Sequence, residues 1–164
     1  CTFANNGRTS SFHWVIQTTV VGTTLTNCVL WNNLSSQGVN NAPVFLSSNN
    51  IRPRFDACLV QGWNGTLPGA GSFTADPKFV SLLGTGGLVG TIDDDVRVRA
   101  GSPSEDRGLM SDAVAALQLD LIGNPRAYDE PRATVAGFGP IDLGAYERTR
   151  PSRGAVRLFK PRRD

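Results

Sequence analysis

Two stretches of the sequence repeat each other without a gap, and this repeat limits the possible folds more than any other feature. Residues 14–33 (WVIQTTVVGTTLTNCVLWNN) align with residues 44–63 (VFLSSNNIRPRFDACLVQGW), so that Leu25 matches Phe55 and Cys28 matches Cys58. The first residues, CTFANN, match CVLWNN in the first stretch, which gives all three cysteines one repeat position. Cysteine spacings of 27 and 30 residues, with many β-branched and turn residues between them, predict stacked coils of a β-solenoid.

Alternation within each repeat predicts which side chains face the core. In stacked coils the repeated apolar face must be internal, because each coil buries that face against its neighbours. The internal positions are then Val21, Thr23, Leu25, Cys28 and Leu30 in the first repeat, and Ile51, Pro53, Phe55, Cys58 and Val60 in the second. The outward positions are Val20, Gly22, Thr24 and Thr26 in the first repeat, and Asn50, Arg52, Arg54 and Asp56 in the second.

The cysteines Cys1, Cys28 and Cys58 are expected to be free thiols that pack as small apolar residues. Three cysteines cannot all pair, and the absence of a CxxC motif together with a single histidine, His13, disfavours a zinc site. A disulfide remains the alternative, because neighbouring coils lie about 4.8 Å apart and Cα distance alone would allow one.

Composition favours turns and short strands over helices, because 18 glycines and 10 prolines accompany many Ser, Thr and Asn residues. No apolar run approaches the roughly 20 residues that a membrane-spanning helix needs. The chain begins within a repeat unit, without an initiator Met or a signal peptide, so we expect the C-terminal part of a longer protein. The alternative, Cys1 as the lipid-modified first residue of a bacterial lipoprotein, is disfavoured by the match of Cys1 to the other cysteines.

The repeat fades after Gly62, and the remaining pattern predicts an irregular region. Strands are expected at three places: at the end of residues 75–80, which begin with a turn, within residues 93–100, where apolar and charged residues alternate, and at residues 140–146. Helical spacing over residues 111–119 predicts one short helix that begins at Ser111 or Asp112. We expect β-helix coils in residues 1–80, a capping region of the same domain in 81–147, and a basic tail in 148–164. No nucleic-acid motif accompanies the seven Arg and Lys residues of the tail, so no specific nucleic-acid binding is expected.

Four motifs follow TNCVLWNN in a fixed order: TADPKFVS, DDDVRVRAGSPSEDRG, DLIGNPR and IDLGAYE. With this set the chain resembles the C-terminal end of bacterial secreted right-handed parallel β-helix proteins of the pectin-lyase-like superfamily, and among them the choice-of-anchor Q domain proteins. The resemblance covers most of residues 1–147. It departs from the pattern at Glu105-Asp106, where an apolar residue then Asp is usual, at the helix-like residues 109–120, and in the short basic tail, which replaces an anchoring segment.

The resemblance implies an all-β fold, a right-handed parallel β-helix of two to three coils, with an irregular C-terminal cap that contains one short helix. It also implies a secreted or cell-surface protein. It does not supply a reaction, because the superfamily includes lyases, hydrolases and adhesive or structural solenoids.

Arg52, Arg54 and Asp56 are the candidate catalytic residues, since all three project from one outward face. Polysaccharide lyases of this fold use an outward carboxylate and base, and an arginine can act there as base or clamp. The matching positions of the first repeat are chemically empty, however, and a lyase site needs acidic groups from adjacent coils. We therefore interpret the three residues as a solvated face with a surface ion pair.

Asp93, Asp94 and Asp95 are the candidate metal ligands, because calcium prefers clustered hard oxygen atoms. Successive residues of a strand point to opposite sides, so the alternative is a charged turn before a strand. No other cofactor is expected. Asp106, Arg126 and Asp142 lie in these motifs. We expect Arg126 to bond a carboxylate of the motifs, with Asp106 and Asp142 as the candidates, and so to lock the cap. The alternative is a pair of catalytic carboxylates.

Trp31 and Trp63 fall at nearly equivalent turns and could stack on sugar rings, although packing under loops is the alternative. The sequence thus favours a non-catalytic extracellular or cell-surface β-solenoid with a role in structure, assembly or glycan adhesion. The alternative is the C-terminal part of a polysaccharide lyase or glycoside hydrolase whose active coils lie upstream. Expected partners are a polysaccharide or a cell-surface protein, and upstream coils or another subunit at the N-terminal edge.

Overall fold

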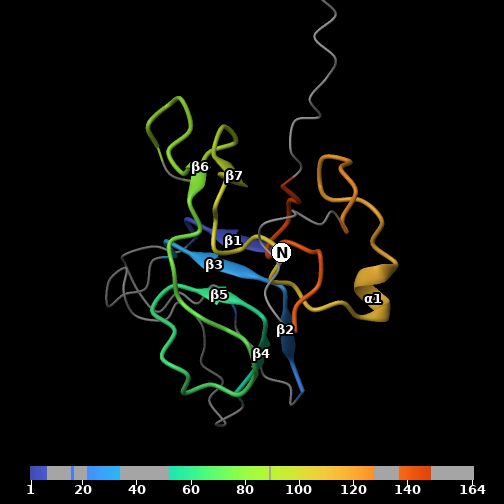
Figure 1. Cartoon of the computed structure of the whole chain (residues 1–164). Coiled ribbons are helices and arrows are strands. Elements are labelled where there is room, and N and C mark those ends of the chain that lie inside the picture. The colour runs from blue at the N-terminus through green and yellow to red at the C-terminus, as the bar shows by residue number, and fades with distance from the viewer. Residues whose placement is uncertain (7–15, 17–21, 34–51, 89, 128–136, 149–164) are drawn as a thin grey trace, which may run out of the picture.

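The computed structural model of the protein describes residues 1–6, 16, 22–33, 52–88, 90–127 and 137–148. Within these residues the chain forms seven short strands and one helix, so the expected all-β character is confirmed (Figure 1). The elements are β1 (Thr2–Ala4), β2 (Thr24–Thr26), β3 (Val29–Trp31), β4 (Arg54–Asp56), β5 (Leu59–Val60), β6 (Phe79–Ser81), β7 (Asp95–Val98) and α1 (Asp112–Ala115).

Two parallel ladders carry the sequence repeat. One sheet has the strand order β1-β3-β5, and a second sheet pairs β2 with β4. Leu25 pairs with Phe55 across the second sheet, and the amide of Leu59 donates to the carbonyl of Cys28 at 2.9 Å in the first. The alignment of the two sequence stretches is therefore also the register in which the strands pair.

The predicted internal face is buried. One cluster contains Leu25, Cys28, Leu30, Phe55, Cys58 and Val60, and the partly buried Ile16 and Trp63 pack against it. The outward positions Thr24, Arg52 and Arg54 are exposed. Burying a large apolar side chain contributes roughly 1.5–3 kcal/mol, so this face supplies much of the stability of the two ladders.

A second apolar cluster lies on the face of the β1-β3-β5 sheet opposite the internal positions, where the sequence pattern indicated no core. Val29, Ala57, Leu59 and Leu143 are buried there, with Phe73, Phe79 and other partly buried side chains around them. The C-terminal half of the chain packs over this face and shields it from water. The central strands are thus buried on both faces, as is usual for parallel sheets.

Asparagines shape the turns between strands. Asn5, Asn27 and Asn32 have φ angles of 57°, 56° and 52°, a left-handed conformation that asparagine tolerates well. The side-chain amide of Asn32 donates to Oδ1 of Asn5 at 2.7 Å, so equivalent turns of neighbouring repeats bond to each other. Ala57 takes the position equivalent to Asn27, with φ of 48°.

The stacking continues past Gly62, where the sequence repeat fades. The amide of Phe55 donates to the carbonyl of Pro68 at 2.8 Å, and Leu59 forms a parallel bridge with Phe73. A glycine is required at Gly69, because a Cβ there would lie 1.7 Å from the carbonyl oxygen of Phe55. Residues 67–74 therefore cover the edges of β4 and β5 with a further row of chain.

The C-terminal half contains an antiparallel pair and irregular segments. β6 pairs with β7, with Phe79 opposite Val98, where strands were expected. The helix α1 is shorter than the predicted span of 111–119. The strand predicted at residues 140–146 is absent: this segment is irregular, although Ile141, Asp142 and Leu143 are buried. Its amides bond to separate segments, since Leu143 donates to Ser104 and Gly144 to Asn27, and a strand would pair along one neighbour.

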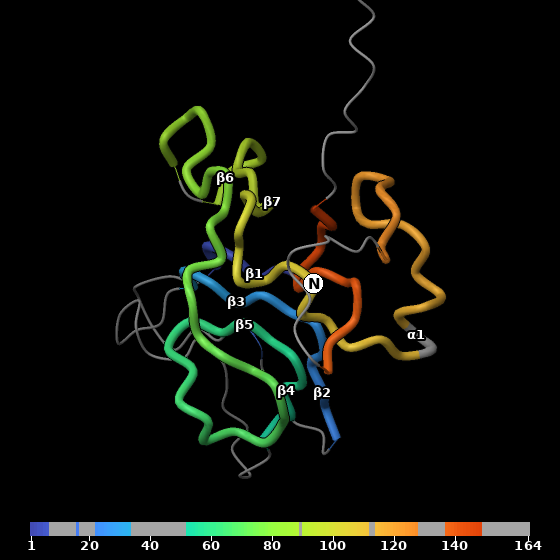
Figure 2. Tube along the Cα trace, viewed as in Figure 1, coloured from blue at the N-terminus to red at the C-terminus, as the bar shows by residue number. Residues whose placement is uncertain are grey.

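Asn27 joins the two halves of the molecule. Its side chain donates to the carbonyl of Leu109 at 2.8 Å and accepts from the amide of Leu109 at 2.7 Å. Its own carbonyl accepts from the amide of Gly144 at 2.9 Å. Figure 2 shows residues 137–148 running close to β2 and β3. One turn residue thus anchors two distant segments of the C-terminal half.

The three cysteines are free thiols, as expected, with Cys28 and Cys58 buried and Cys1 exposed. A hydrogen bond with Cys28 and burial both raise the pKa of the Cys58 thiol, which is therefore protonated at neutral pH. No helix of the described residues is long and apolar enough to cross a bilayer. His13, Val21, Ile51 and residues 149–164 of the basic tail lie outside the described residues.

Candidate functional site

The outward face of β4 carries the three candidate catalytic residues, and two of them neutralise each other. Nε of Arg54 donates to Oδ2 of Asp56 at 2.6 Å, and this bond holds the pKa of the Asp56 carboxyl below its usual range. Nη1 of Arg52 donates to the carbonyl of Thr66. The neighbouring strand offers Thr24 and Thr26 in register. The arrangement is a surface ion pair beside hydroxyl groups, with no second carboxylate in register.

The three candidate calcium ligands do not converge. Asp93 accepts hydrogen bonds from Thr91, Gly86 and Thr85, which hold the pKa of its carboxyl well below the usual range. Asp94 accepts from the side chain of Asn5 at 3.0 Å, whereas Asp95 forms an ion pair with Arg97.

Each carboxylate thus fastens a different segment. Asp93 closes the loop between β6 and β7, Asp94 ties that loop to the turn after β1, and Asp95 pairs within its own strand. The alternative interpretation, a charged turn before a strand, describes this geometry better than a calcium cage.

Three buried carboxyl groups meet in the C-terminal half. Oxygen atoms of Asp106, Asp142 and Glu147 all lie within 4.8 Å of one another, the only such group in the described part of the chain that could hold a metal ion. The oxygens of Asp142 already accept from the amides of Asp106 and Arg148, and both oxygens of Glu147 accept from the amide of Asp142. These bonds favour a structural role, as expected for Asp106 and Asp142.

Burial sets the protonation of this cluster. Desolvation raises the pKa of Asp142 to about 6, and desolvation together with the Asp142 charge raises the pKa of Glu147 to about 9. Glu147 therefore holds a proton at neutral pH. The shared motif IDLGAYE contains Glu147, but its role could not be inferred because the neighbouring carboxyl groups come from distant parts of the sequence.

Arg126 bonds mainly to main-chain carbonyls, and the motif carboxyl group that it approaches is Glu147 rather than Asp106 or Asp142. Its Nη2 donates to the backbone carbonyls of Asp142 and Gly144 at 3.2 and 2.7 Å. Its nearest carboxylate is Glu147, with Nε 4.0 Å from Oε2. The predicted bond to the carboxylate of Asp106 or Asp142 is replaced by bonds to main-chain oxygens, which hold the irregular segment in place.

A groove beside β6 and β7 combines aromatic and charged groups, and we call it the Trp31 groove. It has a volume of about 480 Å³, within the range of small-molecule sites. Its aromatic lining comes from Trp31 and Phe79, and its charged lining from Asp76, Lys78 and Arg99. Within the described part of the chain, this groove brings a predicted sugar-stacking residue, Trp31, together with polar groups.

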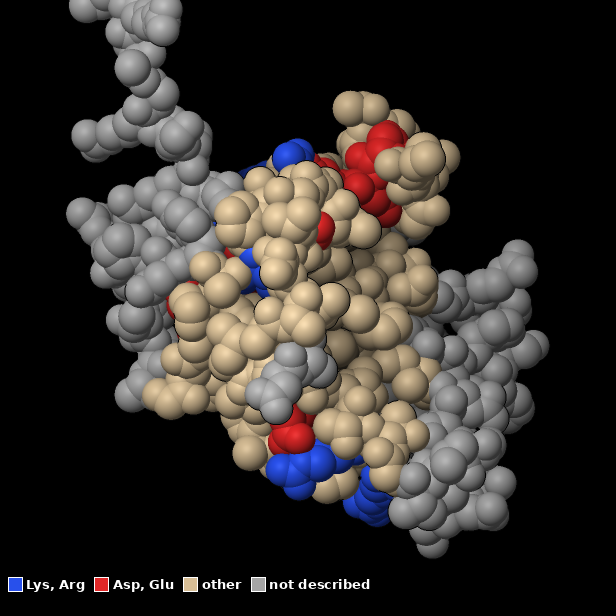
Figure 3. Space-filling view, turned by 90° about the vertical axis from the view of Figure 1, so that its right-hand side faces the viewer, with Lys and Arg blue, Asp and Glu red and all other residues tan. Residues whose placement is uncertain are grey.

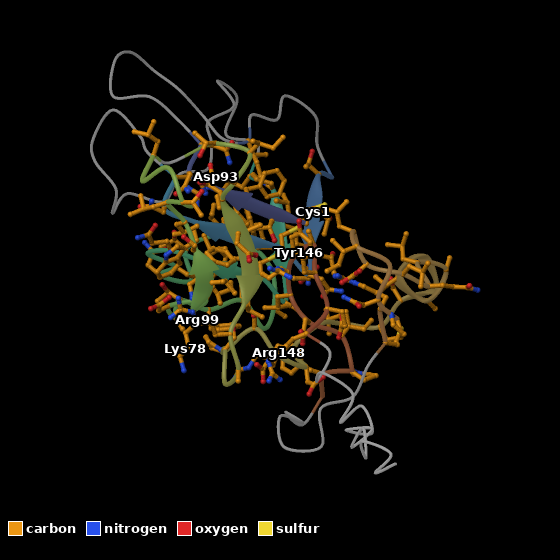
Figure 4. The ribbon with its side chains drawn as sticks, turned by 90° about the horizontal axis from the view of Figure 1, so that it is seen from above. Cys1, Lys78, Asp93, Arg99, Tyr146 and Arg148 are labelled. Carbon is orange, nitrogen blue, oxygen red and sulfur yellow. The ribbon has the colours of Figure 1, made fainter. Side chains whose placement is uncertain are left out.

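Lys78 and Arg99 are neighbours across the β6–β7 ladder, because the amide of Arg99 donates to the carbonyl of Lys78 at 2.9 Å. Figure 4 shows the two side chains next to each other and apart from Tyr146 and Arg148. Nζ of Lys78 donates to the carbonyl of Gly101, and Nη2 of Arg99 to the carbonyl of Val80. Main-chain contacts thus fix both cationic groups at the rim of the groove.

Trp63, the second candidate for sugar stacking, belongs to the core. Its ring lies 5.5 Å from that of Phe55 at an interplanar angle of 55°, and it packs against the cluster that contains Cys28 and Cys58. The alternative interpretation, packing, therefore describes Trp63. Trp31 is partly buried, and it lines the groove while it packs against the cluster around Val29.

Two further cavities offer less chemistry. One, of about 450 Å³, is lined by Arg97, Tyr146 and Arg148, but both arginines are paired, with Asp95 and Glu105. The other, of about 350 Å³, has an apolar lining that includes Leu117, Leu119 and Leu121. Figure 3, which views the side of the molecule that carries α1, shows a mostly tan surface on which charged side chains gather mainly toward the upper and lower ends.

Comparison of the whole sequence and structure with models of protein families, with curated proteins and with solved structures found no match. The arguments for a function therefore come from the residues themselves.

Proposed function

We propose that this protein is a right-handed parallel β-helix that binds a saccharide in the Trp31 groove without transforming it. Three observations support the β-helix. Strands one repeat apart pair in parallel and in register, equivalent asparagines bond between repeats, and residues 67–74 extend the stack by a further row. A secreted or cell-surface location follows from the motif resemblance and is part of the proposal.

The observation that carries the binding proposal is the composition of the Trp31 groove. An indole and a phenyl ring offer apolar faces to a sugar, while Asp76, Lys78 and Arg99 offer hydrogen-bond partners for its hydroxyl groups. Proteins usually recognise small ligands in this way, with apolar walls and a few placed polar groups.

Binding without catalysis is proposed because the outward face of β4 has no free acid or base pair. Arg54 and Asp56 are bonded to each other, and the strand beside them presents threonines. The alternative of a lyase or hydrolase fragment would require groups from segments other than this face.

Among the described strands, the sheet order leaves β1 at an edge, and an unpaired edge readily accepts another strand. We therefore also propose that a further coil or another subunit pairs with β1. This contact would give the protein a role in assembly in addition to saccharide binding.

A glycan array tests the binding proposal. We expect the wild-type protein to bind a subset of oligosaccharides, and the Trp31→Ala variant to lose that binding by about tenfold or more, since an aromatic stacking contact and its buried area disappear together. The Tyr146→Ala variant is the matched control, because it alters a different cavity. The binding proposal fails if no oligosaccharide binds, or if both variants weaken binding equally.

A further inference from the structure

We propose that Lys78 and Arg99 form a binding site for an oxyanion, so that the saccharide taken by the Trp31 groove carries a carboxylate or a sulfate group. This inference rests on the proposed function and names the chemical class of its ligand. Four features of the groove lead to it: the position of the two cations, their remaining hydrogen-bond donors, the backbone that holds them, and the adjacent rings.

The first feature is the position of two cationic residues at one end of the β6–β7 ladder. Lys78 directly precedes β6, Arg99 directly follows β7, and the amide of Arg99 donates to the carbonyl of Lys78 at 2.9 Å. Both residues line the Trp31 groove. Among the described residues neither Lys78 nor Arg99 forms an ion pair, although Asp76 lines the same groove. Two cationic groups of one groove thus lack an internal counter-charge that an external anion would supply.

The second feature is the number of donors that remain. An ammonium group has three N–H donors and a guanidinium group has five. The backbone carbonyls of Gly101 and Val80 each accept one bond, at 2.7 and 2.6 Å. These bonds orient the two cationic groups and leave further N–H donors for a ligand. Fixed cationic donors of this kind suit the oxygens of a carboxylate or sulfate.

The third feature is the backbone at Lys78, which has φ of 54°, a conformation that is rare for lysine. Oδ1 of Asp76 accepts from the amide of Lys78 at 2.8 Å and closes the turn that holds this conformation. An unfavourable backbone held in place beside a groove is typical of a site where the side chain must point in one direction.

Arg97 supplies an internal comparison on the same strand. Its guanidinium is occupied by Asp95, which accepts from Nε at 2.8 Å, and it lines the other cavity rather than the Trp31 groove. Arg99, which has no carboxylate partner among the described residues, thus lines the Trp31 groove, whereas the paired Arg97 does not. This contrast distinguishes a ligand site from a generally basic surface.

The fourth feature is the pair of rings, which makes a sugar-borne anion a better fit than a free ion. Trp31 and Phe79 line the groove within the same 480 Å³ as the two cations, enough space for a sugar ring and its substituent. An inorganic anion would contact the cations and leave the rings unused.

The experiment measures dissociation constants by isothermal titration calorimetry with three hexasaccharides: neutral chitohexaose, hyaluronan with carboxylates, and keratan sulfate with sulfates. We expect one or both charged probes to bind at least tenfold more tightly than chitohexaose, with an affinity that falls as salt rises. The probe that binds better identifies the anionic group.

The test variants are Lys78→Asn, which keeps a residue that tolerates positive φ, and Arg99→Gln. Each should weaken binding of the charged probe about tenfold and reduce its salt dependence, while binding of chitohexaose stays unchanged. Arg97→Gln is the matched control and should leave all three affinities unchanged. Thermal melts of each variant establish that it is folded, and Arg99→Gln alone suffices if Lys78→Asn does not fold.

Two results would overturn the inference. Charged probes that bind no better than chitohexaose, or that bind Arg99→Gln as tightly as wild type, show that the cation pair does not select the ligand. In either case retained binding of chitohexaose would leave the proposed saccharide function standing. If none of the three probes binds, the inference fails, and the glycan array decides the proposed saccharide function by itself.

Discussion

The buried carboxyl group of Glu147 predicts an unusual result: its replacement by glutamine should stabilise the protein at neutral pH. The side chain is fully buried, beside Asp106 and Asp142, and Arg126 is 4.0 Å away. Because burial raises its pKa from 4.5 to about 9, the native state holds a proton that the unfolded state releases. Glutamine resembles the protonated form in shape and cannot ionise.

The sign and size follow from proton linkage. Between pH 4.5 and about 9 the native state binds one more proton at this site than the unfolded state, so the free energy of unfolding falls as pH rises. Each pH unit changes it by about 1.4 kcal/mol. This loss in the free energy of unfolding is absent below pH 4.5 and reaches about 3 kcal/mol at pH 7. Glu147→Gln removes this loss, so wild type and variant should be equally stable near pH 4.5 and diverge above it.

Urea denaturation of both proteins at pH 5, 6, 7 and 8 measures this difference. Glu105→Gln is the contrasting variant, because it breaks the 3.3 Å ion pair with Arg148 and should lower stability at pH 7 by about 1–3 kcal/mol. The reasoning is refuted if Glu147→Gln is less stable than wild type at pH 7. Glu147 would then be ionised and paired with Arg126, since breaking a buried ion pair costs about 3–5 kcal/mol.

Two further predictions concern the stacked repeats. In urea denaturation, Gly69→Ala should lower the free energy of unfolding by more than about 3 kcal/mol, because the new Cβ would meet the Phe55 carbonyl. Gly65→Ala is the control: Gly65 also has positive φ, but a Cβ there would have nothing within 4 Å, so the loss should be only about 1 kcal/mol. Equal losses would show that residues 67–74 do not pack on β4. A chromogenic thiol reagent should label one cysteine, Cys1, in the native protein and all three in urea; labelling of Cys28 or Cys58 without denaturant would contradict their burial.

The sequence correctly predicted the features that follow from the match between one repeat and the next. The pairing of Leu25 with Phe55 follows from alignment alone, because stacked strands in register must carry similar side chains inward. The separate roles of Asp93, Asp94 and Asp95 also agree with a local rule, that neighbours in a strand point apart.

The features that were missed depend on contacts between distant segments. Val29 and Leu59 alternate out of phase with the internal face, and they are buried only because Leu143 and its neighbours fold back over them. The bonds from Arg126 to main-chain carbonyls carry no sequence signal, because any residue supplies a carbonyl. The strand predicted at residues 140–146 had an apolar pattern, but its amides bond to several segments instead of one partner strand.

The two tryptophans show how position along a strand decides between core and site. Trp31 lies two residues after Val29 in β3 and therefore shares the face that the C-terminal half covers, next to β6 and β7. Trp63 follows the end of β5 and packs against Phe55 on the internal side. The groove thus exists because a strand residue of the first repeat meets a hairpin about 50 residues later. Lys78 and Arg99 are neighbours only because β6 and β7 pair in antiparallel register. In the sequence, the alternation around Val96 and Val98 predicts a strand but does not identify the strand that pairs with it. A binding site in this fold is therefore expected where the irregular C-terminal half crosses the β1-β3-β5 sheet, on the face opposite the cluster that contains Cys28 and Cys58.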